Sequence, residues 1–281
     1  MRHVPVMWKE VLENLPEKLN VFMDGTLWHA GHTKLIIENK SPNKVIWVDK
    51  DPKIIKVAEK NLAWFDNVQF VNDSYKNLDK FLDSKVSWML LDLWVNMEHF
   101  KDASRGFSIK KDWPLDMRFD PNSWKTAKDI LRTYSTAKLS EIFQKYWDFS
   151  WRLLDLIVST IEKWRFWLET TYDLKNLLKN AWINEKKIAV IFQVLRIETN
   201  NELDQLEEFL SKFQDYLEIW WRCLIITYHS IEDRLVKNRF KELDKNWFKN
   251  LTKKVIFPTW AEIQKNRASR SAKLRVIEKV S

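Results

Sequence analysis

The sequence VFMDGTLWHAGHT occupies residues 21–33 and decides the fold. Its first three residues form a short apolar run that ends at Asp24, which is typical of a buried strand. The loop that follows contains small residues, and a helix is predicted from about Thr33. Such a loop lets backbone approach a ligand, and the start of the helix offers free N–H groups. This strand–loop–helix unit predicts the first element pair of a parallel α/β sheet.

The same rhythm continues over the first hundred residues. Further strands are predicted at residues 44–48, 68–71 and 88–93. Pro52 opens a helix that runs to about Leu62, since proline is tolerated at the first helical position. Strands that alternate with helices indicate a parallel sheet with covering helices. We therefore expect a doubly wound, Rossmann-like α/β fold.

The rhythm breaks after Asp92. Residues 122–198 have helical apolar spacing, for example at Leu139, Ile142, Phe143 and Tyr146. Strand character returns at residues 223–228 and 274–277. We expect a core of residues 1–105, a mostly helical inserted substrate-recognition domain of residues 106–203, and a second core part of residues 204–281 with a basic end.

Composition and charge narrow the class of protein. The chain has 281 residues and a net charge of +8, which favours polyanionic partners, with nucleic acid first. A solvated basic surface is the alternative. Cys223 is the single cysteine, which excludes an internal disulfide and a cysteine-based metal cluster. We predict no metal site. Residues 1–6 lack the apolar core of a secretion signal and no run approaches a membrane span, so we expect a cytoplasmic protein without a membrane partner.

Tryptophan is unusually common and glycine unusually rare. The chain has 17 Trp and 3 Gly, whereas average usage predicts about 20 glycines. Trp182 follows a predicted helix at the place where glycine closes helices, and Trp220 lies in a predicted turn before an apolar run. We hypothesise that most of these Trp are glycine in the native cell, through a reassigned codon such as UGA. The alternative is a genuinely Trp-rich protein.

Three acidic residues end predicted strands, namely Asp24, Asp49 and Asp92. Ligands of open parallel sheets bind beyond the carboxyl ends of the strands. A carboxylate at Asp49 is placed to accept hydrogen bonds from both hydroxyls of a ribose. The loop lacks a clean G-x-G-x-x-G and a Walker lysine, which argues against a pyrophosphate. A dinucleotide and S-adenosylmethionine both remain, and the second is favoured because it has no phosphate.

With the suspect Trp read as Gly, motifs along the whole chain resemble the bacterial small-subunit ribosomal RNA cytosine-N4 methyltransferase family, the MraW or RsmH type. The matching segments are residues 3–6, residues 24–32 for D-G-T-x-G-x-G-G-H, residues 91–95 for L-D-L-G-V, residues 105–108 for R-G-F-S, residues 112–118 for D-G-P-L-D-M-R, residues 192–203 for F-Q-A-L-R-I-x-V-N-x-E-L, residues 220–222 for G-G-R, residues 229–234 for H-S-L-E-D-R, and residues 269–275. Together the set is highly specific, although no single motif decides it. Several Trp then fall at family glycines: Trp28, Trp94, Trp113, Trp220 and Trp221, with Trp47, Trp88, Trp124 and Trp147 as further candidates.

The resemblance implies a class I fold and assigns cofactor-binding residues. Ala30, Gly31 and His32 would line the methionine end of S-adenosylmethionine, Asp49 would hold the ribose, Tyr75 would pack near the adenine, and Asp92 would sit beside the reactive end, with His99 completing the set. His99 stands where the family has Gln, and Asn96 and Met97 replace a Ser pair. These departures put the roles of this segment in doubt. Each residue also has a structural interpretation: a helix cap for His32, a turn for Asp49, a core aromatic for Tyr75.

The implied reaction is the N4-methylation of a cytidine in small-subunit ribosomal RNA near the decoding centre. Asp92 is the candidate acceptor for the amino hydrogens, and Asp116 and His229 are candidate aids to base placement or proton removal. A satisfied histidine at a strand end is the alternative for His229. Ribosomal RNA or the assembled small subunit is the expected partner, and a homodimer is possible within the family.

Two other functions are open at this point. One is an S-adenosylmethionine-dependent methyltransferase that acts on another nucleic acid or on a protein. The other is a catalytically dead RNA-binding assembly factor, which gains ground if the Trp residues are real. Indoles at Trp28 and Trp94 would fill space beside the cofactor and overpack the site.

Overall fold

A seven-stranded sheet lies at the centre of the first part of the protein. The computed structural model describes residues 5–281 apart from residues 18, 27–30, 95–98, 101, 124 and 148. The strands follow the order β3-β2-β1-β4-β5-β7-β6, and only β7 runs antiparallel to its neighbours. Their bounds are β1 (Val21–Asp24), β2 (Lys44–Asp49), β3 (Val68–Asn72), β4 (Val86–Asp92), β5 (Leu217–Thr227), β6 (Phe248–Asn250) and β7 (Lys273–Lys279).

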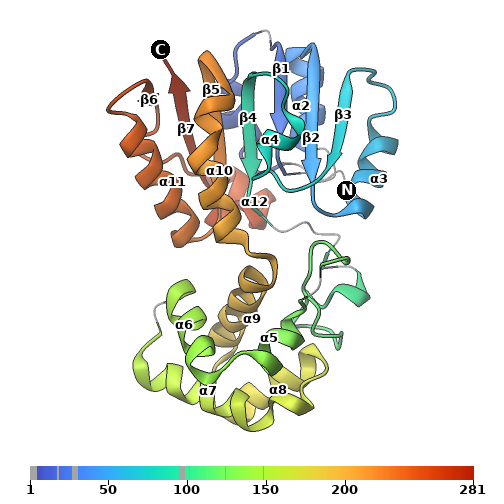
Figure 1. The fold of residues 1–281 in the computed structure, drawn as a ribbon, viewed down its shortest axis with the longest axis vertical. Coiled ribbons are helices and arrows are strands. Elements are labelled where there is room, and N and C mark those ends of the chain that lie inside the picture. The colour runs from blue at the N-terminus through green and yellow to red at the C-terminus, as the bar shows by residue number, and fades with distance from the viewer. Residues whose placement is uncertain are drawn as a thin grey trace. The chain divides into compact units, whose positions relative to one another are not determined.

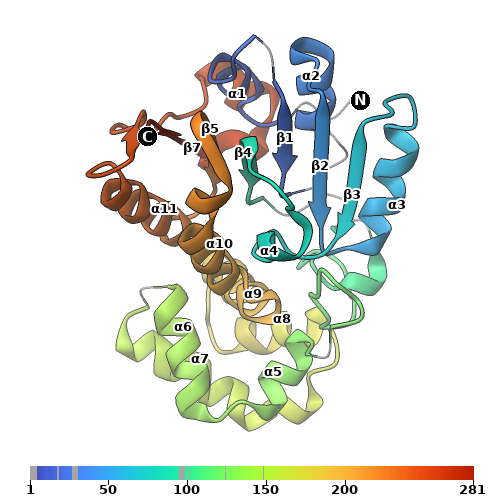
Figure 2. The same ribbon diagram turned by 45° about the horizontal axis from the view of Figure 1, so that its top comes forward.

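Helices cover both faces of this sheet, as Figures 1 and 2 show from two directions. Successive strand residues point to opposite faces, so Phe22 and Leu90 join one apolar cluster while Met23 and Leu91 join the other. The first cluster is completed by α1 (Trp8–Glu13), α2 (Gly31–Lys40) and α3 (Pro52–Asn61), and the second by α4 (Leu78–Phe81), α10 (Glu202–Tyr216) and α11 (Ser230–Leu243). The expected doubly wound α/β fold is confirmed.

Local sequence explains why the covering helices begin where they do. Pro52 is the first residue of α3, and the carboxylate of Asp51 accepts a hydrogen bond from the Lys53 amide at 2.9 Å. This side-chain cap satisfies an N–H group that the helix itself leaves open. The expected strands at residues 44–48 and 68–71 appear one residue longer, as β2 and β3. The short strand β6 was not expected.

The second part of the protein is helical. It contains η1 (Ala103–Arg105), α5 (Ala127–Thr133), α6 (Thr136–Tyr146), α7 (Trp151–Trp164), η2 (Arg165–Trp167), α8 (Thr171–Asn180) and α9 (Glu185–Asn200). Capping boxes open two of these helices: Thr126 with Asp129 before α5, and Thr170 with Asp173 before α8. Each box satisfies two backbone donors reciprocally, so sequence-local signals set the helix starts here.

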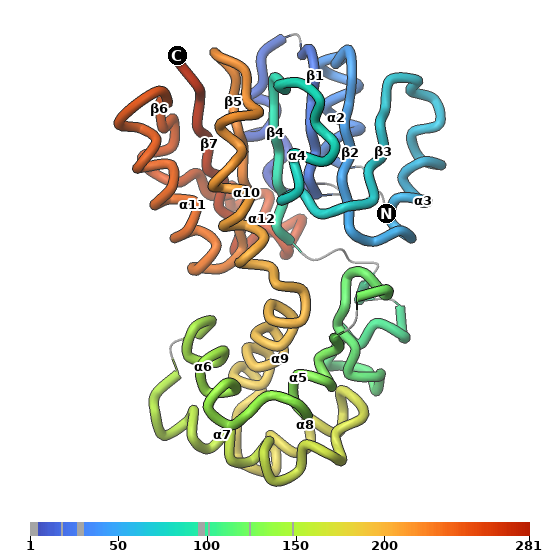
Figure 3. Tube along the Cα trace, in the orientation of Figure 1, coloured from blue at the N-terminus to red at the C-terminus, as the bar shows by residue number. Residues whose placement is uncertain are grey.

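The chain divides into two compact units. One consists of residues Met1–Trp94 and Leu203–Ser281, and the other of Val95–Glu202. The tube in Figure 3 shows the chain leaving the sheet unit after β4 and returning to it at α10. Within the described part of the chain, no helix combines the length and apolar character that spanning a membrane requires. The C-terminal part of the sheet unit ends with α12 (Trp260–Lys265), η3 (Arg267–Ser271) and β7.

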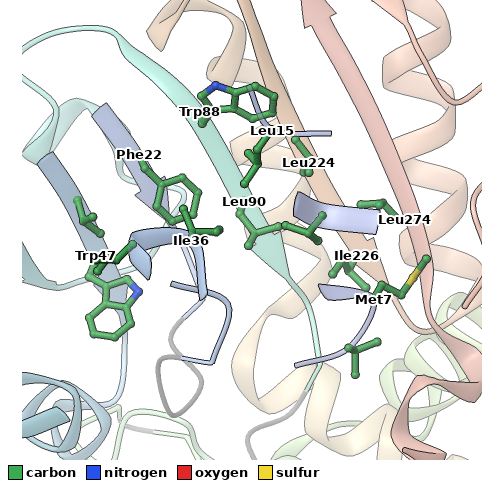
Figure 4. Close-up of a cluster of buried hydrophobic side chains, with 14 of the residues drawn as sticks. Met7, Leu15, Phe22, Ile36, Trp47, Trp88, Leu90, Leu224, Ile226 and Leu274 are labelled. Atoms are coloured by element: carbon green, nitrogen blue, oxygen red, sulfur yellow. The ribbon is translucent and has the colours of Figure 1, made fainter. Parts of the chain in front are cut away.

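Several Trp side chains sit in backbone or core positions that do not suit them. Trp182 and Trp220 have φ values of 60° and 70°, in the left-handed region that glycine tolerates best. Trp47 and Trp88 are fully buried in the cluster of Figure 4, and the indole N–H group of Trp88 has no hydrogen-bond partner among the described residues. A buried donor without a partner costs about 1–3 kcal/mol. These observations agree with the glycine hypothesis, which protein sequencing must decide.

Candidate active site

The strand order reverses between β1 and β4, so the carboxyl ends of these strands form the switch point of the sheet. Asp24 ends β1 and Asp92 ends β4. The Gly25 amide donates to the Leu90 carbonyl at 2.9 Å, and the Asp92 amide donates to Thr26 Oγ1 at 2.6 Å. The loop after β1 is therefore held against β4 at the place where ligands of such sheets bind.

The buried carboxylate of Asp24 joins this loop to α2. The Thr33 hydroxyl donates to Oδ2 at 2.5 Å, and the Thr26 amide donates to Oδ1 at 3.2 Å. Burial raises the pKa of Asp24 to about 6, and the hydrogen bond from Thr33 opposes this rise. Because each oxygen accepts a hydrogen bond from the loop or the helix, Asp24 has a structural role at the switch point.

Asp92 is also buried; the Trp94 amide approaches its Oδ1 at 3.5 Å, and its other partners come from distant parts of the chain. The Tyr228 hydroxyl donates to Oδ1 at 2.8 Å, and His32 Nδ1 lies 3.6 Å from Oδ2. Burial raises the pKa of Asp92 to about 7, while the hydrogen bond from Tyr228 opposes this rise. A carboxyl group with a pKa near neutrality exchanges protons readily at physiological pH. Asp92 is thus equipped to accept a proton.

His32 lies in the first turn of α2, and its ring faces Asp92. Its Nε2 lies 2.8 Å from the Val6 carbonyl oxygen, and because a carbonyl only accepts, Nε2 carries the proton. Burial lowers the pKa of His32, so the ring is neutral and Nδ1 presents a lone pair toward Asp92. This lone pair repels the ionised carboxylate, in the same direction as burial. His32 therefore contacts Asp92 rather than capping the helix.

Two glycines allow the tight packing around the switch point. A Cβ atom on Gly25 would lie 2.4 Å from Leu91 Cδ2 and 3.0 Å from Tyr75 Cβ. A Cβ atom on Gly31 would lie 2.7 Å from Pro5 Cγ. Both distances are shorter than real Cβ contacts, so any side chain would displace its neighbours. Ala30, the third residue expected at the methionine end, lies outside the described residues.

Asp49 ends β2, beside β1 at the same edge of the sheet. Its Oδ1 accepts a hydrogen bond from the Asp51 amide at 2.8 Å, and its backbone carbonyl accepts one from Asn72 Nδ2 at 2.9 Å. These contacts form the turn into α3. The expected contact with a ribose stays a prediction.

Tyr75 follows β3 and is half-buried. Its ring meets that of Phe209 edge-on, with the centroids 5.7 Å apart. Because its Cβ also approaches Gly25, Tyr75 lies beside the loop after β1. Its position fits both a core aromatic and a wall for an adenine.

Two further candidates lie in the helical unit. The ring of His99 is buried against Phe107 and Phe119, at 5.1 Å from each centroid, and these two rings also stack on each other at 5.5 Å. Asp116 binds the Arg118 guanidinium through both oxygens, at 2.9 Å to Nε and 2.6 Å to Nη2. A bidentate carboxylate–guanidinium pair fixes the orientation of both side chains. Their expected roles stay predictions.

His229 caps α11. Its Nδ1 accepts from the Glu232 amide at 3.4 Å, and the Glu232 carboxylate accepts from the His229 amide at 3.3 Å. Glu232 Oε1 also lies 2.8 Å from His229 Nε2. His229 Nε2 is nevertheless buried without a hydrogen-bond partner among the described residues. The interpretation of His229 as a satisfied histidine and its catalytic role both stay predictions.

Sequence reasoning missed Tyr228, which contacts Asp92 across 136 positions of sequence. The usable signal was its place directly after β5, which neighbours β4 in the sheet. The sequence motifs assign a role to His229 at this strand end but none to the neighbouring phenol. Thr26, which receives the Asp92 amide, was missed as well.

Comparisons with known proteins match nearly the whole chain. Residues 1–280 match the MraW methylase family. Ribosomal RNA small subunit methyltransferase H of Petrotoga mobilis is 40% identical, over 97% of this chain and 99% of its own length. The protein of the same name from Brachyspira hyodysenteriae is 36% identical, over 99% of this chain and 97% of its own.

Solved structures show more distant likeness. An rRNA methylase from Streptococcus thermophilus has a TM-score of 0.47 and 12% identity, with 98% of this chain and 94% of that chain covered. A methyltransferase from Streptococcus mutans in complex with SAH has a TM-score of 0.47 and 13% identity, with 99% and 100% covered. The assignment that follows is carried by the family match and the sequence relatives.

Proposed function

The chain belongs to the MraW methylase family, and from this premise we propose that it methylates ribosomal RNA of the small subunit, with S-adenosylmethionine as the methyl donor. The relatives from Petrotoga and Brachyspira, each named ribosomal RNA small subunit methyltransferase H, support this substrate. We propose the exocyclic N4 of a cytidine near the decoding centre as the target atom. The observation that carries the proposal is Asp92, a buried carboxyl at the switch point with a pKa of about 7.

The described residues fit a cationic methyl donor. Burial raises the pKa of Asp92 to about 7, because its anionic form is incompletely compensated. A bound cation supplies the missing compensation. When bound, S-adenosylmethionine supplies a methyl group activated by a positively charged sulfonium.

The proposed binding residues follow the family motif. Gly31 and His32 line the methionine end together with Ala30, Asp49 holds the ribose, Tyr75 packs near the adenine, and His99 completes the set. In support, His32 contacts Asp92, and Tyr75 adjoins the loop after β1. Asp49 shares the same edge of the sheet.

Asp92 is the proposed proton acceptor. The lone pair of a cytosine amino group is delocalised into the ring, so an acceptor that draws on the amino hydrogens helps the nitrogen to rehybridise. As the nitrogen–carbon bond forms and the sulfur–carbon bond breaks, one amino proton passes to the Asp92 carboxylate. Positioning supplies much of the remaining catalysis. Asp116 and His229 are proposed aids to base placement or proton removal.

RNA binding is proposed for the helical unit and the basic C-terminal segment. The target base must leave its stack to reach a methyl donor. Folded RNA is recognised largely by backbone charge and shape. Exposed cations suited to this task include Lys253, Lys254, Lys265, Arg267 and Arg270.

The decisive experiment is tritiated-methyl transfer to small ribosomal subunits, followed by nucleoside analysis. We expect N4-methylcytidine, and loss of at least about 10²-fold in rate for Asp92→Ala, because a positioned proton acceptor contributes about that much. Asp92→Asn keeps the shape of the side chain and serves as the matched variant. A tritiated methyl group on another atom refutes the N4 target. Methylation of naked RNA or protein alone supports a methyltransferase with a substrate other than the small subunit.

The indole of Trp94 offers one explanation if the protein shows no methyl transfer in this assay. Its ring packs against Tyr228 with centroids 4.6 Å apart, next to Asp92 in sequence and space. The assay therefore includes Trp94→Gly and Trp28→Gly proteins, although Trp28 itself lies outside the described residues. Activity gained on these changes shows that the indoles obstruct the site. No transfer and no cofactor binding in any variant would leave a catalytically dead assembly factor.

A further inference from the structure

Tyr228 is a buried residue that directly follows β5 and has no role in the function proposed above. Its hydroxyl donates to Asp92 Oδ1 at 2.8 Å. We propose that Tyr228 is the positioning residue of Asp92: its hydrogen bond fixes the rotation of the carboxylate and stabilises the ionised form that accepts the substrate proton. This inference rests on the proposed function, since it concerns how Asp92 performs its step.

The backbone around Tyr228 is held by α11. Glu232 is buried in the first turn of that helix, and its Oε2 accepts from the Tyr228 amide at 2.8 Å and from the His229 amide at 3.3 Å. Two consecutive amides are thus fixed by one carboxylate. The ring of Tyr228 also packs against that of Trp94, with centroids 4.6 Å apart. The Glu232 contacts fix the backbone of Tyr228 independently of Asp92, as a positioning residue requires.

Asp92 is surrounded by groups that favour its protonated form. Burial is the largest effect, and the negative charge of Glu232 on α11 acts in the same direction. The neutral ring of His32 on α2 turns a lone pair toward it. Asp24 on β1 interacts with His32 and so belongs to the same cluster. The Tyr228 hydroxyl is the main group that stabilises the ionised carboxylate.

Tyr228 remains a donor throughout the working pH range. Burial raises its pKa well above the ordinary value, and the negative charges of Asp92, Glu232 and Glu262 reinforce this. The phenol therefore keeps its own proton when the amino proton moves to Asp92. In this step Tyr228 neither gains nor loses a proton. The Asp92 carboxyl loses its proton to solvent after the product leaves.

The test is Tyr228→Phe, measured as a pH–rate profile on small ribosomal subunits. A hydrogen bond to a charged group is worth about one to two pKa units, so the acidic limb of kcat should move upward by about that much. Near pH 7 the rate falls about five-fold or more, because fewer Asp92 carboxyls are ionised, and it recovers at pH 9. KM for the subunits should change little, whereas the Kd for the cofactor at pH 7 should rise as the ionised fraction of Asp92 falls. A role in folding alone would not move the limb.

The matched control is Tyr146→Phe in the helical unit. Tyr146 donates to Glu198 Oε2 at 2.7 Å, so this variant deletes a hydrogen bond of the same kind away from Asp92. Its pH profile should remain that of the unchanged protein. An unmoved limb in folded Tyr228→Phe, or an equal shift in Tyr146→Phe, overturns the proposal.

A second readout needs no substrate. The carboxyl carbon of Asp92 is titrated by NMR, with Asp92→Asn to assign the signal, and Tyr228→Phe should raise the measured pKa. If Tyr228→Phe fails to fold, trifluorotyrosine at position 228 keeps the ring and donates more strongly, so the pKa should fall instead. If the unchanged protein does not methylate subunits, the proposed function fails while this titration still decides on Tyr228. An Asp92 pKa that stays the same in both Tyr228→Phe and the trifluorotyrosine protein refutes the inference.

Discussion

Replacing Trp182 by glycine and by alanine tests whether the left-handed backbone at this position favours glycine. The test compares the free energies of unfolding of the two variants. Trp182 follows α8, with φ 60°. Its amide donates to the Lys179 carbonyl at 2.9 Å, and the Ile183 amide donates to the Leu178 carbonyl at 3.1 Å. These two bonds define a Schellman motif with Trp182 at the left-handed position. Asn201, in the same conformation after α9, is a residue that such positions accept.

The magnitude follows from the backbone and the exposure. Trp182 is 95% exposed, so removing its indole loses little packing. A side chain with a Cβ costs about 1–2 kcal/mol in the left-handed region, and alanine keeps this cost whereas glycine removes it. Trp182→Gly should therefore exceed Trp182→Ala by about 1 kcal/mol in free energy of unfolding. At Trp151, an exposed residue at the start of α7, glycine should instead be the less stable of the two by roughly 0.5 kcal/mol.

Urea unfolding followed by far-ultraviolet circular dichroism measures both pairs. The glycine variant at position 182 should also unfold about 2–4 °C above the alanine variant. If the alanine variant is as stable as the glycine variant at position 182, the left-handed backbone does not disfavour a side chain there. Trp182 then needs no glycine in its place. Mass spectrometry of protein made by the native cell then shows directly whether glycine or tryptophan is inserted.

Three further predictions concern the switch point. Asp24 has a pKa raised from 3.8 to about 6, so its stabilising effect is complete only below pH 3.8 and is lost as pH rises through 6. Asp24→Asn should reduce the fall in unfolding free energy between pH 4 and pH 7.5 by about 2 kcal/mol, and equal falls in both proteins would contradict this. Gly31→Val should destabilise the fold by about 1–3 kcal/mol through contact with Pro5, and should weaken cofactor binding, as thermal unfolding and titration calorimetry can check. Binding of S-adenosylmethionine should weaken about tenfold or more between pH 7.5 and pH 5.5, because Asp92 must be ionised to face a cation. Binding of S-adenosylhomocysteine, which lacks the positive charge, should respond less. Identical pH responses of the two ligands would argue against Asp92 facing the sulfonium.

Strand and helix types followed from local sequence because the physical signals are local. Apolar runs that end in Asp24, Asp49 and Asp92 predicted strands that the structure contains. Capping residues such as Thr126 and Thr170 mark helix starts inside the stretch predicted to be helical. The doubly wound arrangement then follows from the alternation of strands and helices.

Partners of the site residues could not be predicted in the same way. The bond between Tyr228 and Asp92 depends on β5 lying next to β4, although 124 residues separate the end of β4 from the start of β5. The irregular register of that pair, where Val86 faces Leu217 but Trp88 faces Arg222, is set by tertiary packing and has no local signature. The residue types indicated candidate catalytic groups, whereas the strand order of the sheet determines which of these groups are in contact.

Two aspartates at equivalent strand ends have different tasks because their donors differ. Asp24 accepts from Thr26 and Thr33, which follow it closely in sequence, so any arrangement of β1 and α2 that satisfies Asp24 also fixes the loop. Asp92 accepts from Tyr228, a donor brought in by another strand. A carboxylate held by its own loop contributes to folding whether or not a ligand is present. The ionisation of Asp92 is opposed by burial and supported chiefly by the Tyr228 phenol, with a weaker contribution from the Trp94 amide. Such a carboxylate responds to the charge placed beside it, and this sensitivity makes Asp92, rather than Asp24, the residue suited to exchange a proton during each turnover.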